Sequence, residues 1–499
     1  MPFSPSRYQQ GFFDFIADGS GSAVVEAVAG SGKTTTVIAS LDYIPEHYSI
    51  CMTAFNKSIA QELTERVPDY VQVMTLNGMG FRAYLKIHRS VKIDAKKTQK
   101  IVNNLIGSMD FEIIQAVTKL VALAKNHGIS PLLARPGLML NDYSSWAGLI
   151  DHYALDVTKE DRRFVIEQAK EALLLSVQST GIIDFDDQLY MPVLLRAPFQ
   201  QFDFLFVDEA QDVSPIQREM LKRSLALNGR LIAVGDPRQA IYGFRGADSN
   251  SMNNIAKEFS AQTFPLSISY RCPKSVVAYA QQIVNHIESA DTAPDGTVMS
   301  LKYFSEDIFY SDDMIVCRNT APLISLAFSL IGKHVACQVI GRDIGQGMIA
   351  LIKKLKSKSI KMLIEKLEAW RIREIEKALA RDDDDKIDSI TDKAESIQVF
   401  IDHGDPKSID DLIGQISYML SDTKRQVLTL CTVHKAKGLE ADTVYVLNPG
   451  LMPAPWASKR MWQQEQERNL QYVAFTRAKS KLIFINSDGF VAKNLEKVA

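Results

Sequence analysis

The sequence has few of the residues that build metal centres or disulfide frameworks. Its 499 residues include five cysteines and eight histidines. No two cysteines stand at C-x-x-C spacing, and the histidines show no metal-ligand spacing, so zinc and iron–sulfur centres are not expected and a reducing compartment is favoured. Long apolar runs are also missing. None approaches about 18 residues, which argues against a transmembrane helix, and Met1–Ser4 does not open a signal peptide.

The sequence also lacks an excess of either charge. Lysine and arginine total 57, aspartate and glutamate total 59, and the net charge is −2. This balance argues against a bulk polycation that coats DNA, but a local basic track would still be enough to bind nucleic acid. Hydrophobic residues make up 46% of the chain and charged residues 23%, values that exclude the disordered, collagen and coiled-coil classes. At about 100–200 residues per domain, the length suggests roughly three units.

Short apolar runs that end in polar residues indicate two sets of buried parallel strands. A β-branched run at Val24–Ala27 stops at a glycine-rich loop, and a helical pattern follows it. The other predicted strands are 49–54, 202–208 and 231–236 in a first set, and 314–317, 427–431 and 443–447 in a second. The segments 85–178 and 348–418 are mostly helical. The sequence therefore predicts an α/β fold with two units, each interrupted by a helical insertion, and ligands at the carboxyl ends of the strands.

The first glycine-rich loop fits a phosphate-binding pattern. It reads Ala27-Val28-Ala29-Gly30-Ser31-Gly32-Lys33-Thr34, which matches A-x-x-G-x-G-K-T. Glycines let backbone N–H groups close around phosphate oxygens, Lys33 can reach the β- and γ-phosphates, and the Thr34 hydroxyl can bind Mg²⁺. The alternative is a chance match, since short Gly-Lys-Thr sequences also occur elsewhere. The strand before the loop and the helix after it favour a nucleotide site.

An acidic pair at the end of another strand would complete this site. Asp208 and Glu209 directly follow the apolar run 204–207. Asp208 would hold Mg²⁺, often through water, and Glu209 would orient and deprotonate the attacking water. The alternative is a solvated acidic turn, and the phosphate-binding loop upstream argues against it.

Five segments in one order carry a family resemblance. They are the phosphate-binding loop, Asp208–Asp212, Val234–Ala247, Thr432–Glu440 and Tyr472–Ala478. Together they resemble the UvrD/Rep family of superfamily 1 DNA helicases, over nearly the whole chain. The segment Ala54–Ala60 is also similar to the F-box DNA helicase branch and its phage relatives. The resemblance implies two RecA-like P-loop NTPase cores with parallel sheets, each interrupted by a helical insertion.

The resemblance also implies an ATP site with Mg²⁺ as a second cofactor. Gln9 matches the adenine-reading glutamine, with its neighbour Gln10 as the alternative. Gln239 resembles the γ-phosphate sensor, and Arg271 and Arg477 resemble the arginines that close on the γ-phosphate. The implied catalytic residues are Lys33, Asp208, Glu209, Gln239, Arg271 and Arg477. The implied nucleotide-binding residues are Gln9, Gln10, Ala29, Gly30, Ser31, Gly32, Lys33, Thr34, Thr35, Tyr270 (against the adenine ring), Arg271, Glu440 (near the ribose or cleft) and Arg477. The metal ligands would be Thr34 and Asp208.

Aromatic residues beyond the strand ends suggest a track for single-stranded DNA. By resemblance, Phe55, Tyr242 and Phe244 are base-stacking residues, and stacking tolerates any base sequence; the alternative for each is core packing. Phe244 stands where the family usually has Trp, Asn77 replaces its usual His, and Ser269 replaces its usual Asn. The full implied DNA-binding set is Phe55, Asn56, Lys57, Thr75, Asn77, Tyr242, Phe244, Arg245, Thr432 and His434.

Two acidic stretches remain outside these sets. The segment Thr180–Asp187 resembles the family's acidic segment ahead of the Mg²⁺ motif, and we interpret it as structural. The run Asp382–Asp385 is interpreted as a solvated loop or helix end.

The family's layout assigns the domains. Residues 1–84 and 179–275 form the first RecA-like core, which binds nucleotide, and 85–178 form its helical insertion. Residues 276–347 and 419–499 form the second core, interrupted by a reduced insertion at 348–418.

The predicted activity is an ATP-dependent DNA helicase or translocase that moves 3′→5′ on single-stranded DNA and couples hydrolysis between two cores to strand separation. Two alternatives stay open: a translocase that strips bound proteins without efficient unwinding, and a DNA-stimulated ATPase subunit of a repair or defence complex. The expected partners are single-stranded DNA, duplex junctions, and repair, recombination or replication proteins, with no membrane. A monomeric motor is expected, cytoplasmic in a bacterial or phage-infected cell or nuclear in a eukaryote.

Overall fold

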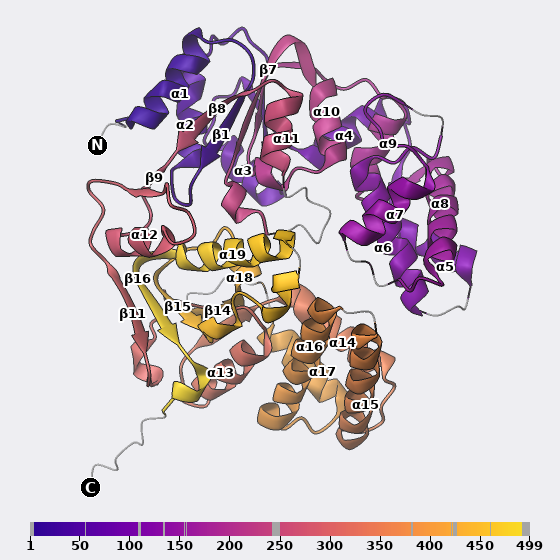
Figure 1. Ribbon diagram of the computed structural model, residues 1–499, viewed down its shortest axis with the longest axis vertical. Coiled ribbons are helices and arrows are strands. Elements are labelled where there is room, and N and C mark those ends of the chain that lie inside the picture. Colours follow the sequence, from indigo (N-terminus) through magenta and orange to yellow (C-terminus); the bar gives the residue numbers. More distant parts are fainter. Residues whose placement is uncertain are drawn as a thin grey trace. The chain divides into compact units, whose positions relative to one another are not determined.

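A computed structural model describes the chain over residues 4–54, 56–107, 111–132, 135–153, 155, 157–241, 250–380, 383–420, 422, 427–459 and 461–491. The chain divides into two compact units (Figure 1). The first comprises Met1–Ala27 and Gly32–Ser267, and the second comprises Val28–Ser31 and Ile268–Ala499.

The first unit is built on a six-stranded sheet in the order β3-β2-β6-β7-β1-β8, and every pairing in it is parallel. Its strands are β1 (Ala23–Ala27), β2 (Ile50–Ala54), β3 (Val71–Thr75), β6 (Phe202–Val207), β7 (Leu225–Gly235) and β8 (Gln262–Leu266). The helices of this core are α1 (Arg7–Asp18), α2 (Lys33–Ser40), α3 (Lys57–Thr64), α4 (Leu76–Leu85), α9 (Asp187–Leu194), α10 (Pro215–Arg223) and α11 (Ser251–Glu258).

Both faces of this sheet are buried, which explains why its strands are apolar without strict alternation. Val25 packs with Phe12 and Phe13 of α1 on one face. Its neighbour Val24 packs with Ile255 of α11 on the other. Parallel strands between two helical layers have all their carboxyl ends at one edge, and that edge carries the glycine-rich loop and the acidic pair.

Four helices form the insertion of the first unit: α5 (Lys97–Ile106), α6 (Phe111–His127), α7 (Tyr143–His152) and α8 (Arg162–Gln178). Two short strands, β4 (Lys92–Ile93) and β5 (Ile182–Ile183), pair in parallel where the chain enters and leaves it. One apolar core runs from the sheet into these helices, because Leu205 of β6 belongs to the same buried cluster as Leu120 and Trp146.

A buried charge cluster joins the insertion to the core. Lys125 of α6, which is 0% exposed, lies 2.8 Å from both Asp184 and Asp187. Lys97 of α5 lies 2.7 Å from Asp187. Burial alone would lower the pKa of Lys125, but the two carboxylates outweigh burial and raise it. The segment Thr180–Asp187 therefore makes structural contacts between insertion and core.

The second unit contains a six-stranded sheet in the order β11-β16-β15-β12-β14-β13, again with parallel pairings throughout. Its strands are β11 (Thr297–Leu301), β12 (Met314–Cys317), β13 (Cys337–Ile340), β14 (Leu428–Thr432), β15 (Ala441–Leu447) and β16 (Ala478–Ile485). A small parallel pair, β9 (Ile268–Ser269) and β10 (Glu288–Ser289), precedes it. The helices of this core are α12 (Lys274–Ala280), α13 (Ala321–Ile331), α18 (Val433–Ala436) and α19 (Met461–Phe475).

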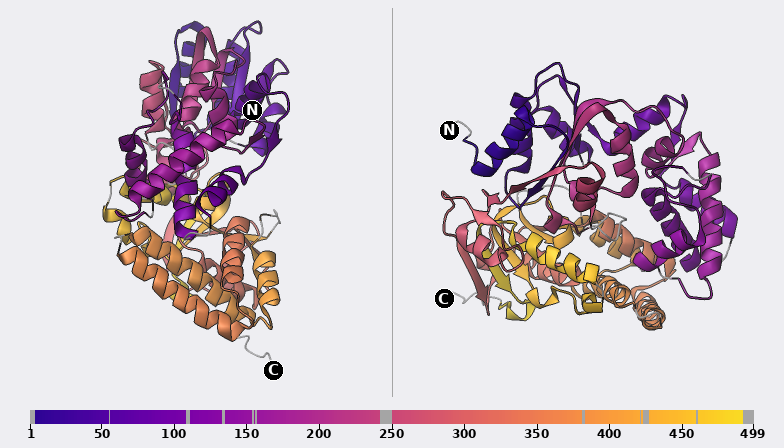
Figure 2. Two further views of the ribbon diagram at one scale, coloured as in Figure 1. Left: turned by 90° about the vertical axis from the view of Figure 1, so that its right-hand side faces the viewer. Right: turned by 45° about the horizontal axis from the view of Figure 1, so that its top comes forward.

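The insertion of the second unit is formed by α14 (Arg342–Lys354), α15 (Ile360–Leu379), α16 (Asp384–Gly404) and α17 (Ile409–Met419). Its two long helices, α15 and α16, lie side by side (Figure 2). The acidic run is a helix end: Asp383 caps α16 by accepting a hydrogen bond from the Lys386 N–H at 3.1 Å, and Asp384 begins the helix. Asp382 lies outside the described residues.

The α/β class and the two parallel sheets predicted from the sequence are confirmed. Strands β3, β8, β11, β13 and β16 were not predicted. Along the chain, the first unit ends at Ser267 and the second continues from Ile268. Within the described ranges, no helix combines the length and the apolar character that crossing a bilayer requires.

Candidate nucleotide and nucleic-acid sites

Lys33 and Glu209 form an ion pair in the first unit. Lys33 is the first residue of α2, and Gly32 before it adopts a left-handed conformation at φ 76°. Lys33 Nζ lies 3.2 Å from Glu209 Oε1, and the two side chains are 14% and 26% exposed. Burial would lower the pKa of Lys33, but Glu209, Asp208 and Asp236 together outweigh burial and raise it. A fixed ammonium group at a helix N-terminus suits binding of phosphate.

Gln211 links this pair to the end of the next strand. Its side-chain NH₂ group donates to the Glu209 carboxylate, and its side-chain oxygen Oε1 accepts from the Asp236 N–H at 3.0 Å. Asp236 in turn accepts from the Gln239 amide at 2.7 Å. Gln211 is 1% exposed and Gln239 is 5% exposed. The predicted base Glu209 and the predicted sensor Gln239 are thus connected through buried side chains. Gln211 was not among the residues predicted for the site. The signal available in the sequence was its place within the acidic motif Asp208–Asp212.

The predicted adenine-reading residue is engaged inside the first unit. Gln9 is 3% exposed; its oxygen accepts from the Ser6 N–H at 2.9 Å and its amide donates to Thr36 at 2.8 Å. Gln10 is exposed and donates to Asp14 at 2.7 Å. Gln9 therefore connects α1 to the helix that follows the phosphate-binding loop. Thr34 and Thr35 lie in the first turn of that helix.

Arg271 in the second unit forms an ion pair with Glu440. Its Nε lies 2.7 Å from Glu440, and Lys479 lies 2.6 Å from the other oxygen of Glu440. Burial would raise the pKa of Glu440, but Lys479 and Arg271 outweigh burial and lower it. Tyr270, next to Arg271, is 51% exposed. Tyr270, Arg271 and Glu440, three of the residues predicted to bind the nucleotide, thus lie within one cluster.

The part of the glycine-rich loop that belongs to the second unit is held by hydrogen bonds to its backbone groups. The Ala29 N–H donates to the Tyr472 hydroxyl at 2.9 Å, and the Tyr270 N–H donates to the Gly30 carbonyl at 2.8 Å. Gly30 has φ +73°, and a Cβ there would lie 2.5 Å from the Arg271 Cβ. Glycine is therefore required at Gly30 for two reasons, conformation and space. Ser31 is 2% exposed, and its N–H donates to the Val28 carbonyl at 3.1 Å.

Arg477 is 1% exposed and donates to carbonyl oxygens of its own unit. Its Nε reaches the Val473 carbonyl at 3.0 Å, and one terminal nitrogen reaches the Leu439 carbonyl at 3.3 Å. These bonds fix the guanidinium beside Leu439, the residue before Glu440.

Two predicted DNA-binding residues cap helices in the first unit. Asn56 accepts from the Ile59 N–H at 2.9 Å at the start of α3, where Lys57 is exposed. Thr75 accepts from the Gly78 N–H at 3.0 Å at the start of α4. Both loops follow carboxyl ends of neighbouring strands, since β2 pairs with β3.

Asn77 contacts an aromatic residue, Phe185, that was not among the predicted site residues. Its amide donates to the Phe185 carbonyl at 2.9 Å and to the Gln188 side chain at 3.1 Å. Phe185 is 56% exposed. The signal available in the sequence was a phenylalanine between two aspartates, Asp184 and Asp186. Phe55, Tyr242, Phe244 and Arg245 lie outside the described residues.

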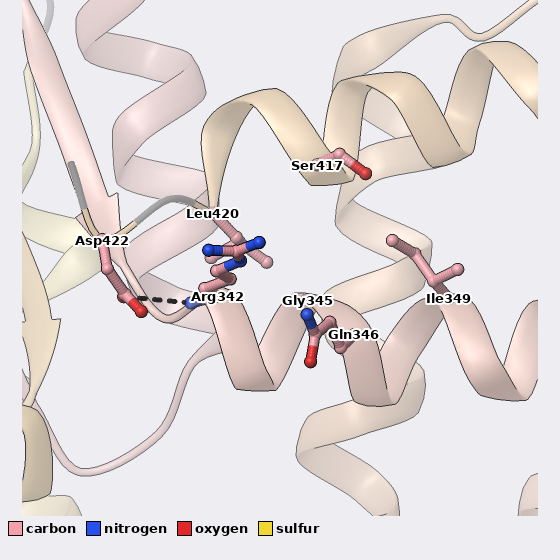
Figure 3. A pocket seen from close by; sticks show the side chains of 7 residues that line it. All are labelled: Arg342, Gly345, Gln346, Ile349, Ser417, Leu420 and Asp422. Carbon is pink, nitrogen blue, oxygen red and sulfur yellow. Dashed lines mark hydrogen bonds between the residues drawn. The ribbon is translucent and has the colours of Figure 1, made fainter.

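In the second unit, Thr432 ends β14 and is 7% exposed, while His434 in the following turn is partly exposed. The residues of the described chain contain no cluster of three or more histidine, cysteine or acidic side chains fit to hold a metal. A cavity of about 500 Å³ lies between α14 and the end of α17, lined by Arg342, Gln346, Ser417 and their neighbours (Figure 3). It contains none of the predicted ATP- or DNA-binding residues.

A glycine-rich loop before a helix, an acidic pair after another strand of the same sheet and a second parallel α/β unit define a two-core P-loop NTPase. The model of the UvrD/REP helicase N-terminal domain matches residues 13–260, and that of the UvrD-like helicase C-terminal domain matches residues 428–485. The chain belongs to the UvrD/Rep family of superfamily 1 helicases.

Three helicases are similar to this chain at low sequence identity. The chain is 25% identical to F-box DNA helicase protein 1 of Schizosaccharomyces pombe, over 92% of this chain and 55% of the relative. It is 24% identical to the ATP-dependent DNA helicase PcrA of Leuconostoc citreum, over 53% of this chain and 37% of the relative. It is 21% identical to the ATP-dependent DNA helicase Rep of Buchnera aphidicola from Acyrthosiphon pisum, over 93% and 92%. The chain thus spans about half the length of the F-box relative.

Proposed function

We propose that this chain is an ATP-dependent DNA helicase or translocase that moves 3′→5′ along single-stranded DNA. The observation that carries the proposal is the ion pair of Lys33 with Glu209, joined through Gln211 to Asp236 and Gln239. A cation for phosphate and a base that orients water are parts that an ATP-hydrolysing site needs, and membership of the helicase family supports DNA as the track. The polarity rests on family membership.

The roles of the ATP-site residues follow from their chemistry. Lys33 binds the β- and γ-phosphates in place of its contact with Glu209, which frees the Glu209 carboxylate to accept a proton from water. Gln239 senses the γ-phosphate, and Arg271 and Arg477 neutralise charge that develops on it. Gln9 or Gln10, Tyr270 and Glu440 hold the base and ribose.

The residues around Lys33 also fit Mg²⁺. Thr34 and Asp208 offer hydroxyl and carboxylate oxygens, the ligands that Mg²⁺ prefers, and this ion keeps waters and substrate phosphates as its other ligands. When bound, the ion supplies positive charge to the phosphate oxygens. Thr34 and Asp208 would hold it.

The proposed DNA contacts lie at carboxyl ends of strands within each unit. Asn56, Lys57, Thr75 and Asn77 supply polar contacts in the first unit, and Thr432 and His434 do so in the second. Phe185, whose backbone carbonyl accepts from Asn77, adds an exposed ring, and stacking on such a ring contributes about 1–3 kcal/mol per base. Affinity from stacking and a few contacts suits a chain with net charge −2.

Two other functions stay as alternatives: protein stripping without unwinding, and a DNA-stimulated ATPase subunit of a repair or defence complex. The insertion of four helices at 342–419 is the observation that favours stripping, because a small insertion leaves less structure to engage a duplex.

The test combines three measurements on the full chain: ATP hydrolysis with and without oligo-dT, unwinding of duplexes with a 3′ or a 5′ tail, and displacement of streptavidin from a biotinylated single strand. We expect stimulation by oligo-dT and unwinding from the 3′ tail. Absence of stimulation would refute the motor. Stimulation with streptavidin displacement but no unwinding would support the stripping translocase, stimulation with neither would support the ATPase subunit, and unwinding from the 5′ tail alone would overturn the polarity.

A further inference from the structure

Two carboxylates on one face of α16 hold the segment that follows β12. Asp388 accepts from the Asn319 amide at 3.2 Å. Asp392 accepts from the backbone N–H groups of Thr320 and Ala321 at 2.8 and 2.9 Å. Residues four apart lie on the same side of a helix, so both acids point to one stretch of chain.

Asp392 supplies a cap that α13 does not have locally. Thr320, at the N-cap position of α13, makes no side-chain capping hydrogen bond. The first N–H groups of a helix have no partner within the helix, and a negative charge there is favoured by the helix dipole. The insertion thus completes the start of a core helix.

The same segment is held from its other side by α19. Arg318 Nε donates to Glu467 at 2.9 Å, and the other oxygen of Glu467 accepts from the Ala454 N–H at 3.0 Å. Glu467 is 2% exposed. The Arg318 guanidinium also lies 5.7 Å from the centre of the Trp456 ring. The stretch from Arg318 to Ala321 is therefore fixed between the insertion and the core.

Packing makes the insertion a fixed part of its core. Ile390, Ile397 and Phe400 of α16 belong to the same buried cluster as Ile324 of α13 and Leu430 of β14. In Figure 1, α16 can be followed beside the core, where it contacts α13. A continuous apolar core resists separation of the two parts, because separation would expose it to water.

This anchored segment adjoins the proposed DNA contacts. Cys317, the residue before Arg318, is the register partner of Thr432. On the other side of β14, Ile340 is the partner of Cys431, and Lys435 pairs with Asp343 at 2.7 Å. The ends of β12, β14 and β13 thus form one edge, which includes Thr432 and lies two residues from His434.

We propose that Asp388 and Asp392 are positioning residues through which the insertion sets the geometry of the DNA-binding edge of the second core. They act through the Arg318–Ala321 segment and do not touch DNA themselves. The proposal rests on the proposed function of Thr432 and His434. It gives the insertion a role in DNA affinity that is separate from any contact with a duplex.

The test compares Asp392→Ala, Asp392→Asn and Asp388→Ala in the full chain. Asparagine keeps an oxygen that can accept both N–H groups, and alanine removes it. We expect Asp392→Ala to raise the oligo-dT concentration for half-maximal ATPase stimulation by about 5- to 10-fold, the effect of losing one or two hydrogen bonds. Asp388→Ala should raise it less, and Asp392→Asn should stay within about twofold of the wild type. The KM for ATP should not change. Asp402→Ala is the matched control, because Asp402 is exposed on α16 and contacts Gln398 of the same helix.

The outcomes separate this proposal from the proposed function. If oligo-dT does not stimulate the wild type, the proposed function fails first. If it does, and folded Asp392→Ala and Asp388→Ala keep the wild-type half-saturation, the positioning role is refuted. An equal rise in the half-saturating oligo-dT concentration for Asp392→Asn and Asp392→Ala would also refute it. So would a rise in the KM for ATP as large as the rise in that oligo-dT concentration. Thermal unfolding of each variant identifies loss of fold, and Asp388→Ala decides the question if Asp392→Ala does not fold.

Discussion

Lys33 Nζ and Glu209 Oε1 lie 3.2 Å apart, so the cation that would bind phosphate neutralises the carboxylate that would activate water. This pairing stabilises both charges. Phosphate would compete for Lys33, and a Glu209 carboxylate that loses its cationic partner becomes a stronger base. Binding and activation of the base are therefore linked through one ion pair.

Replacing Lys33 by Ala should abolish hydrolysis while the chain still folds. The phosphates lose their cation and three nearby carboxylates lose their counter-charge, so kcat should fall by at least about 100-fold. Steady-state ATPase measurements with oligo-dT check this, with circular dichroism to verify folding. The exposed Lys159→Ala serves as control. Activity within tenfold of the wild type would contradict the assigned role.

Replacing Gln211 by Leu should lower kcat about 10- to 100-fold while the KM for ATP stays within about threefold, because Glu209 loses its orienting donor and the Asp236 N–H loses its acceptor. Steady-state kinetics over a range of ATP concentrations separate the two constants. Gln200→Leu, at an exposed position of the same unit, is the control. A rise in KM alone would mean that Gln211 acts in binding only.

Replacing Phe185 by Ala should weaken DNA binding. Loss of one stacking platform of about 1–3 kcal/mol corresponds to a rise of roughly 5- to 150-fold in the dissociation constant for oligo-dT. Fluorescence anisotropy with labelled oligo-dT measures it. Phe164→Ala tests an aromatic that is 36% exposed on α8. Equal effects from both variants would argue against a specific site at Phe185.

Replacing Lys125 by Met should destabilise the first unit strongly. Asp184 and Asp187 would remain buried with Lys97 as their partner, and removal of one member of a buried pair costs about 3–5 kcal/mol. Urea unfolding measures the change. Lys100→Met breaks an exposed pair with Asp94 and should leave the urea midpoint almost unchanged. Similar midpoints for both variants would show that the buried cluster contributes little.

Replacing Asp186 by Asn should stabilise the chain at neutral pH. Burial, followed by repulsion from Asp184, raises the pKa of Asp186 from 3.8 to about 6. The folded chain therefore binds more protons than the unfolded chain between these values, and the Asp186 contribution to stability falls as pH rises through this window. Above it, Asp186→Asn should gain about 1–2 kcal/mol, at roughly 1.4 kcal/mol per pKa unit reduced by partial solvent access. The stability gain of Asp186→Asn should vanish below pH 4. Thermal unfolding of both proteins across this pH range measures it. A gain that does not change with pH would contradict the titration of Asp186.

The two-unit α/β architecture and the phosphate-binding loop were predictable because their signals are local. A β-branched run, a Gly-Ser-Gly-Lys-Thr loop and a helical pattern follow one another directly, and Asp208 and Glu209 directly follow a buried strand. Strands such as β3 and β11 gave weaker signals, because they carry exposed residues at sheet edges.

Other features depend on contacts between distant parts of the chain. Gln211 reaches Asp236 and Asp392 caps a helix 71 residues before it. Lys125 is neutralised by aspartates about 60 residues away. A side chain's partner is decided by packing, and no local pattern encodes that. The sequence by itself thus determined the fold class and the motifs that bind phosphate, whereas the tertiary structure decided which buried polar groups connect them, because each such group must find its partner where the chain folds back.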